Sequence, residues 1–290
     1  MIHKINNNHL YLAVDTEGAQ LKSLCDVHGT EYLWQPDEKI WTGQALVLFP
    51  VVGRFFEGKY IYDGKTYEME NNGFAQTSRF KVVKKLSDQI TLRITENAET
   101  LSQYPFRFTF DVSFELSDNS FTQRFIITNN SDCDMPYALG GHPGFRVPIE
   151  EDEKFEDYYL KFEHIENCNT SVLYCDVPAE SDEWIPLLEN TNVLRLRREL
   201  FTRGVLLLEN HKSRSVELIS SLSGKGIRMD FEGFDNLGLW SRNNGNYLCI
   251  EPLSSPGTHS VPSGPIEKRK GMKILSAGKT AEFTFKATVI

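Results

Sequence analysis

Two short motifs, far apart in the chain, supply side chains that can transfer protons. His142 lies in Gly-Gly-His-Pro-Gly-Phe at residues 140–145, and Glu251 lies in Tyr-Leu-Cys-Ile-Glu-Pro at residues 247–252. Each follows an apolar run typical of a strand, so we expect both residues at strand ends. An imidazole facing a carboxylate is the minimum equipment for general acid–base catalysis.

Each residue also has a plainer interpretation. The glycines before His142 allow positive φ angles and close approach of the backbone, and Pro143 stiffens the turn that we expect to follow, so the imidazole is held in place. A carboxylate among apolar neighbours has its pKa raised toward that of a useful base. Taken alone, however, each residue fits a structural role better, as a histidine that hydrogen-bonds a turn and a glutamate paired with a lysine or arginine.

Two further side chains could contact a ligand. Arg54 ends the apolar segment 48–54, and a guanidinium presents a fork of donors to hydroxyl oxygens, although a structural ion pair explains it equally well. Trp240 could offer a flat apolar face, but large aromatic residues are by default part of a core. His259, close to Glu251 in the sequence, is a candidate of second rank.

Composition bounds the class of protein. The 290 residues are 40% hydrophobic and 24% charged, which suits a large core, and we expect one domain over residues 1–290. A net charge of −9 argues against nucleic-acid binding, which needs a basic face. We see no secretory leader and no run that could span a membrane. The five scattered cysteines, without a CxxC motif, predict reduced thiols in the cytoplasm and no metal site.

The periodicity is that of strands almost throughout. Hairpins are predicted at 59–69, around Asp63-Gly64, and at 106–130, and short strands at 10–14, 204–209, 215–219, 227–231, 237–241 and 281–290. Brief helices are expected only at 96–101 and 195–200, and the acidic run 150–153 reads as a solvated loop. Many regular strands with few short helices predict an all-β sandwich or barrel.

Several segments, in this order, resemble the galactose mutarotase (aldose 1-epimerase) family, in particular its branch associated with lactose operons. They are 31–34, 48–54, 72–76, 141–145, 226–240, 249–252 and 275–279, and together they extend over nearly the whole chain. The resemblance implies a large antiparallel β-sandwich with the sugar bound in an open cleft. It also implies interconversion of the α and β anomers of a free aldose without a cofactor.

Carried over to matching positions, the resemblance gives roles to individual residues. Glu251 would take the proton of the anomeric hydroxyl, and His142 would protonate the ring oxygen. Arg54 would hydrogen-bond the sugar, with Asn72 and Trp240 as further contacts. No metal or other cofactor is implied, the partner is a small-molecule sugar, and the oligomeric state stays open.

The chain departs from the family pattern at three positions. Asn72 stands where the family has a histidine, Gln76 where it has an arginine, and Gly204 where it has an aspartate. An asparagine cannot donate a proton near neutral pH, so we expect lower activity or shifted specificity. Two alternatives stay open: a carbohydrate-binding protein with little or no catalysis, and a hexose-phosphate 1-epimerase. The arginine is absent at Gln76, which argues against a phosphorylated substrate. A cleft with no second cation beside Arg54 would also count against the hexose-phosphate 1-epimerase.

Overall fold

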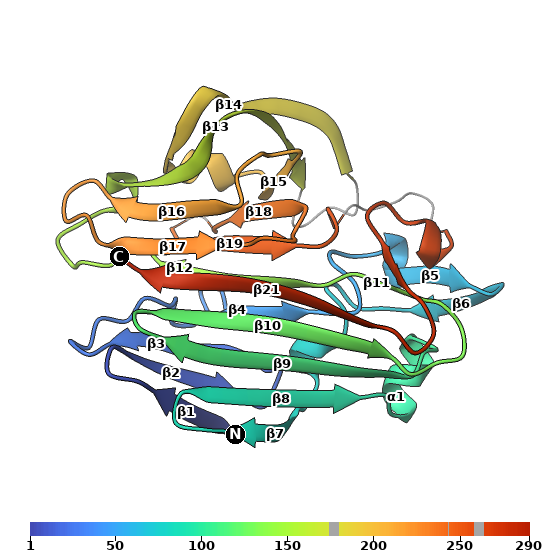
Figure 1. Cartoon of the computed structure of the whole chain (residues 1–290). Helices are drawn as coiled ribbons and strands as arrows, with labels where there is room; N and C mark the ends of the chain where they lie inside the picture. The colour runs from blue at the N-terminus through green and yellow to red at the C-terminus, as the bar shows by residue number, and fades with distance from the viewer. Residues whose placement is uncertain (174–179, 243, 258–263) are drawn as a thin grey trace.

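The structure is a computed structural model that describes residues 1–173, 180–242, 244–257 and 264–290. Most of these residues lie in antiparallel strands, and one large sheet contains most of the strands (Figure 1). The all-β prediction is therefore confirmed.

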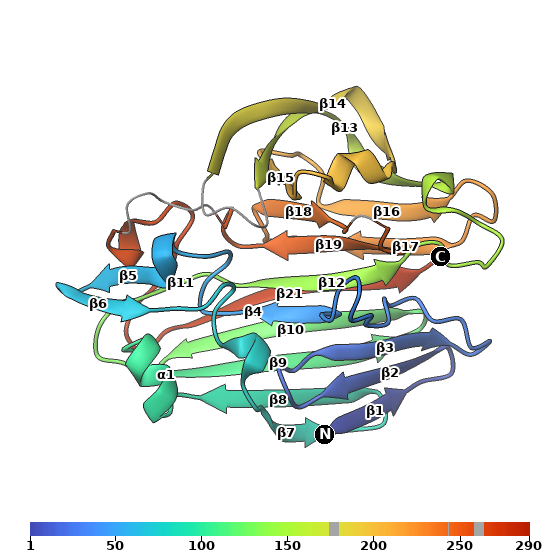
Figure 2. The same cartoon turned by 180° about the vertical axis from the view of Figure 1, so that it is seen from behind.

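The large sheet follows the order β4, β12, β19, β18, β15, β13, β16, β17, β21, β10, β9, β8 and β7, with β14 paired to β13. Its strands are β4 (Ala45–Leu48), β7 (Lys81–Lys85), β8 (Gln89–Thr95), β9 (Phe108–Ser117), β10 (Ser120–Asn129), β12 (Gly140–Arg146), β13 (Tyr158–Leu173), β14 (Glu180–Arg195), β15 (Val205–Glu209), β16 (Ser215–Ser220), β17 (Gly226–Asp230), β18 (Asn236–Trp240), β19 (Tyr247–Leu253) and β21 (Thr280–Val289). Figures 1 and 2 show how it continues from the β13–β19 block at the top into β21, β10, β9 and β8 below.

Smaller sheets and short helices complete the described chain. The sheets are β1–β2–β3 (Ile2–Asn6, Leu10–Asp15, Leu21–Asp26), β5–β6 (Lys59–Tyr62, Lys65–Glu68) and β11–β20 (Met135–Tyr137, Lys273–Leu275). The helices are α1 (Ala98–Gln103) and the 3₁₀ turns η1 (Phe56–Gly58), η2 (Ala75–Thr77), η3 (Phe155–Asp157), η4 (Arg198–Phe201) and η5 (Ile266–Lys268).

Local sequence explains the two hairpins that we predicted. In β5–β6, Asp63 and Gly64 both have positive φ, at 46° and 71°, which is the turn that matches strand twist. In β9–β10 the residues alternate, and Phe108, Phe110 and Phe114 are fully buried. Burying a phenylalanine is worth about 1.5–3 kcal/mol, so these side chains fix the register of the sheet.

Two expectations need correction, and one feature of the fold was missed. Residues 195–200 do not form a helix, because β14 runs to Arg195 and only the 3₁₀ turn η4 follows. The acidic run is not wholly solvated, because Glu153 is buried and accepts hydrogen bonds from Tyr158 and Ser220. The long β13–β14 pair was not predicted at all. The helix expected at 96–101 is α1, which Asn97 caps by accepting from the backbone of Thr100.

Among the described residues, no helix is long and apolar enough to cross a membrane.

Candidate active site

Strand pairing brings the two predicted proton-transfer residues together. Strands β12 and β19 pair Gly140 with Leu253 and Gly144 with Cys249, a register that sets His142 opposite Glu251. The Nε2 atom of His142 lies 3.4 Å from the Oε1 atom of Glu251. Both strands continue past these residues, so the expectation of strand ends, and of a turn after Pro143, was wrong.

Glycines around the pair leave room for it. Gly140 and Gly141 do not have positive φ, so that part of the expectation was wrong, but a Cβ at Gly140 would lie 2.9 Å from the Pro252 carbonyl oxygen, which is the close backbone approach that we expected. A Cβ at Gly141 would lie 2.6 Å from the ring of Phe285. Strand β18 sets Gly238 opposite Glu251, where a Cβ would lie 3.2 Å from Oε2. Glycines within these strands therefore leave space for the carboxylate and for the side chains around it.

Burial changes the acidity of both groups. Glu251 is 4% exposed and His142 is 9% exposed. Loss of hydration disfavours the charged forms, so it raises the pKa of Glu251 to about 8 and lowers the pKa of His142 to about 4. Between these two values the pair carries one proton and no net charge. Among the described residues, Oε1 of Glu251 has no hydrogen-bond partner.

The pair faces a cavity of about 320 Å³. All five site residues predicted from the sequence line this cavity: Arg54, Asn72, His142, Trp240 and Glu251. Trp240 is buried, as expected of a core tryptophan, and it also forms part of the cavity wall. His259 lies outside the described residues.

Of the aromatic and charged side chains in this cavity, sequence reasoning missed Trp41 and Arg242. Trp41 stacks on His142 with ring centroids 5.3 Å apart, and it packs nearly at right angles to Trp240 with ring centroids 5.2 Å apart. A Cβ at Gly144 would lie 2.8 Å from the Trp41 ring, so the glycine of the histidine motif admits this indole. Trp41 comes from a loop without periodicity, and nothing in its sequence surroundings pointed to the site.

Arg242 is the second missed residue, and it had a signal. It follows Trp240 by two positions, and residues two apart on a strand face the same side. Trp240 ends β18, and Arg242 lines the same cavity just beyond it, donating a hydrogen bond to the carbonyl of Ile40. The cavity thus contains a second cation beside Arg54.

The departures at 72 and 76 have local roles. Asn72 has a φ of 64°, its Oδ1 accepts a hydrogen bond from the Gly53 N–H at 2.7 Å, and its own N–H donates to the Gly53 carbonyl. This closes the turn that precedes Arg54. Gln76 donates to the carbonyls of Asn71 and Gly73 within the same loop. Gly204, the third departure, directly precedes β15, whose Val205 and Leu207 line the cavity.

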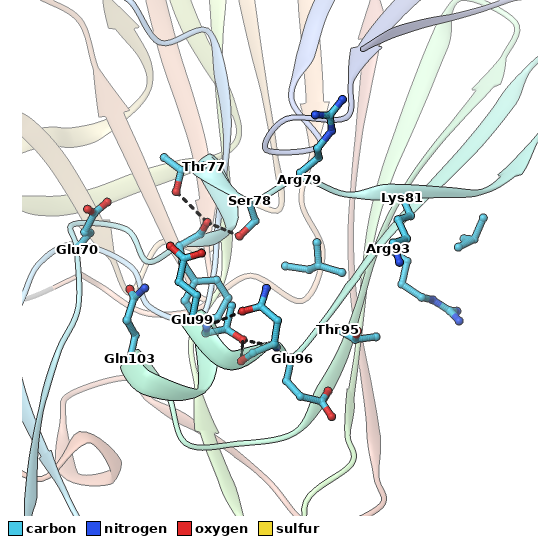
Figure 3. A pocket seen from close by; sticks show the side chains of 15 residues that line it. Glu70, Thr77, Ser78, Arg79, Lys81, Arg93, Thr95, Glu96, Glu99 and Gln103 are labelled. Carbon is cyan, nitrogen blue, oxygen red and sulfur yellow. Dashed lines mark hydrogen bonds between the residues drawn. The ribbon is translucent and has the colours of Figure 1, made fainter.

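A larger hollow, of about 740 Å³, lies elsewhere and is a poorer candidate (Figure 3). Its polar side chains serve local structure: Thr77 and Ser78 donate to the carbonyl of Phe74, and Asn97 caps α1. Its Arg93 forms an ion pair with Asp111. Its lining residues include no histidine and no buried carboxylate, so it offers no proton-transfer pair.

Comparison with known proteins identifies the family. The family model for aldose 1-epimerase matches residues 1–288. The chain belongs to the aldose 1-epimerase family. The family membership supports an enzyme of the isomerase class, as the resemblance implied.

Individual relatives extend over the same length. Protein LacX, chromosomal, from Lactococcus lactis subsp. lactis is 36% identical over 278 residues, which is 93% of each chain. A galactose mutarotase-like protein from Lactobacillus casei ATCC 334 superposes with a TM-score of 0.93 at 29% identity, covering 100% of both chains. A galactose mutarotase related enzyme from Lactobacillus acidophilus gives 0.92 at 29% identity, over 100% of this chain and 97% of that one.

Proposed function

We propose that the protein interconverts the α and β anomers of a free aldose by acid–base catalysis at His142 and Glu251. The observation that carries the proposal is the buried pair, 3.4 Å apart and open to a cavity of the size of a small ligand. Family membership gives the reaction class, and the pair gives the chemistry.

The reaction conserves protons at every step. The Glu251 carboxylate takes the proton of the anomeric hydroxyl while the bond between C1 and the ring oxygen breaks. The ring oxygen takes a proton from the His142 imidazolium, which leaves an open-chain aldehyde. Rotation about the C1–C2 bond presents the other carbonyl face. Reversal of the same two proton transfers then closes the ring as the opposite anomer.

The single proton of the pair suits this scheme. In the empty cavity burial favours the neutral arrangement, with the proton on Glu251 and a neutral imidazole. Sugar hydroxyls entering the cavity would donate hydrogen bonds to the carboxylate and so stabilise its charged form. The proton then shifts to His142, which produces the base and the acid that the first step requires.

The surrounding residues would orient the ring. Trp41 and Trp240 supply apolar surfaces beside the imidazole, against which the C–H faces of a sugar can pack. The guanidinium of Arg54 would donate to a hydroxyl or to the ring oxygen. Asn72 would act chiefly by holding the turn before Arg54.

The demand on the catalyst is modest, because mutarotation proceeds slowly in water. General acid–base catalysis worth about 10²–10⁴-fold, together with orientation, would be useful. The test is NMR exchange between anomers for a panel of free aldoses, with the wild type and Glu251→Gln side by side. We expect acceleration by the wild type that the variant loses. Equal rates for both proteins with every accepted sugar would refute the proposal.

One observation favours a second candidate, a hexose-phosphate 1-epimerase. Arg54 and Arg242 both line the cavity, which supplies the second cation that a phosphate would need. Adding hexose 6-phosphates to the same panel separates the two substrates. Acceleration for a phosphorylated sugar that Arg242→Gln abolishes, with free aldoses unaffected, would favour this candidate. Binding of one sugar without acceleration would instead indicate a carbohydrate-binding protein.

A further inference from the structure

A third side chain with a metal-binding atom lies beside the catalytic pair. Cys249 precedes Glu251 by two positions on β19, so both side chains face the same side of the strand. One ligand atom from each of His142, Cys249 and Glu251 lies within 4.8 Å of the others, and all three residues are buried. Nitrogen, sulfur and oxygen donors thus converge at one point of the sheet.

The spacing suits a tetrahedral ion. Zinc holds histidine nitrogen and carboxylate oxygen at about 2.0–2.2 Å, so two such ligands at the tetrahedral angle lie roughly 3.4 Å apart. Nε2 of His142 and Oε1 of Glu251 are 3.4 Å apart. A thiolate at about 2.3 Å from the ion would lie roughly 3.6 Å from each of them, and the three ligand atoms already lie within 4.8 Å of one another.

One oxygen of the pair also lacks a hydrogen bond. Oε1 of Glu251 is buried and has no hydrogen-bond partner among the described residues. A buried polar atom without a partner costs free energy, and a ligand that binds it recovers that cost.

Charge and donor type narrow the choice of ion. A carboxylate and a thiolate together neutralise a divalent cation, which burial requires. Thiolate and imidazole donors select zinc-like ions and disfavour Mg²⁺ and Ca²⁺, which prefer oxygen. His142 and Glu251 line the cavity, so a fourth position can be filled from the solvent side.

We propose that His142, Cys249 and Glu251 bind a thiophilic divalent cation of the Zn²⁺ class, and that the bound ion blocks the proton-transfer pair. On binding, the Cys249 thiol and the protonated Glu251 carboxyl each release one proton to solvent, and the sulfur and the carboxylate oxygen each donate an electron pair to the ion. The imidazole and the carboxylate then use their lone pairs for the ion and are no longer available to a sugar. The binding site stands by itself, whereas the inhibition rests on the proposed function.

The direct test uses the full-length wild type and Co²⁺, whose visible spectrum reports its ligands. We expect the intense absorption of a thiolate bound to tetrahedral Co²⁺ at one ion per chain, and its loss when Zn²⁺ is added. Calorimetric titration with Zn²⁺ then gives the affinity. A spectrum without the thiolate band, or no heat with Zn²⁺, would refute the proposed binding site. Both measurements use the wild type, so they do not require any variant to fold.

Variants assign the sulfur ligand. Cys249→Ser should weaken Zn²⁺ binding by roughly 10–100-fold or more, since even partners outside the ligand set are worth that much. Cys133→Ser is the matched control, because Cys133 is an exposed free thiol away from the cavity, and should leave the affinity unchanged. The opposite pattern would place the ion at the surface and refute the proposal.

Inhibition is measured separately. Mutarotation should fall as Zn²⁺ occupies the site and should recover when a chelator removes it. Zinc bound at one ion per chain without any change in the rate would refute the inhibitory part. If the protein accelerates no mutarotation at all, the proposed function fails, while the Co²⁺ and Zn²⁺ titrations still decide whether the site exists.

Discussion

Glu251→Gln should make the protein more stable while it removes catalysis. The folded structure raises the pKa of Glu251 from 4.5 to about 8 by burial. Between these values the folded state binds more protons than the unfolded state, so stability falls as pH rises through this window. One pKa unit corresponds to about 1.4 kcal/mol, which gives a cost of about 3 kcal/mol at pH 7.

Glutamine has nearly the same shape as the protonated glutamate and does not titrate, so it escapes this cost. The free energy of unfolding of Glu251→Gln should exceed that of the wild type by about 1 kcal/mol at pH 5 and by about 4 kcal/mol at pH 8. His142 has a lowered pKa, so it makes stability rise with pH between about 4 and 6.5, but it does so in both proteins.

Urea denaturation of both proteins at a series of pH values measures the difference directly. Glu68→Gln is the control, because it makes the same substitution at an exposed position on β6. If the gap between Glu251→Gln and the wild type stays constant from pH 5 to pH 8, the carboxylate is not desolvated as the structure indicates, and the acid–base argument loses its basis.

Three further predictions concern the same site. The value of kcat/KM, corrected for the buffer reaction, should be bell-shaped with limbs near pH 4 and pH 8, because the productive pair holds one proton; a rate that keeps rising above pH 9 would contradict this. Gly144→Ala should displace Trp41 and lower kcat, with a stability cost of about 1–3 kcal/mol, whereas Gly264→Ala, with no atom within 4 Å of its Cβ, should be neutral in the same assays. Asn72→Ala should raise KM and destabilise the protein by about 1–3 kcal/mol, since the Gly53 N–H loses its acceptor; an unchanged KM would show that the turn does not position Arg54.

Much of the fold could be predicted because alternation and turn residues are local signals. The β9–β10 and β5–β6 hairpins follow from phenylalanines at every second position and from Asp63-Gly64. The β13–β14 pair was missed because its residues do not alternate cleanly. It contains Pro186 and Asn190, the latter with a φ of 51°, and several register shifts. Its pairing depends on neighbouring strands, which no local pattern of the sequence records.

The residues of the candidate site also fall into those that local motifs predict and those that only tertiary packing brings in. His142 and Glu251 stand in distinctive motifs, so the sequence and the family resemblance found them. Their distance, however, is set by the register between β12 and β19, which is a tertiary property. Trp41 was missed because a loop residue becomes part of the wall only through its packing against Gly144 and His142. Glu153 was misjudged for a similar reason, since its partners Tyr158 and Ser220 reach it from other elements.

The features that make the pair chemically useful also make it costly for folding. Gly238 leaves space for the Glu251 carboxylate, and Trp41 and Trp240 enclose the imidazole. This enclosure excludes water, and the exclusion raises one pKa and lowers the other until a single proton is shared. A more solvated pair would cost the fold less free energy. At neutral pH, however, its carboxylate would be charged and hydrogen-bonded to water instead of to a sugar. The destabilisation that Glu251→Gln should relieve and the proton exchange that it should abolish therefore have one physical cause.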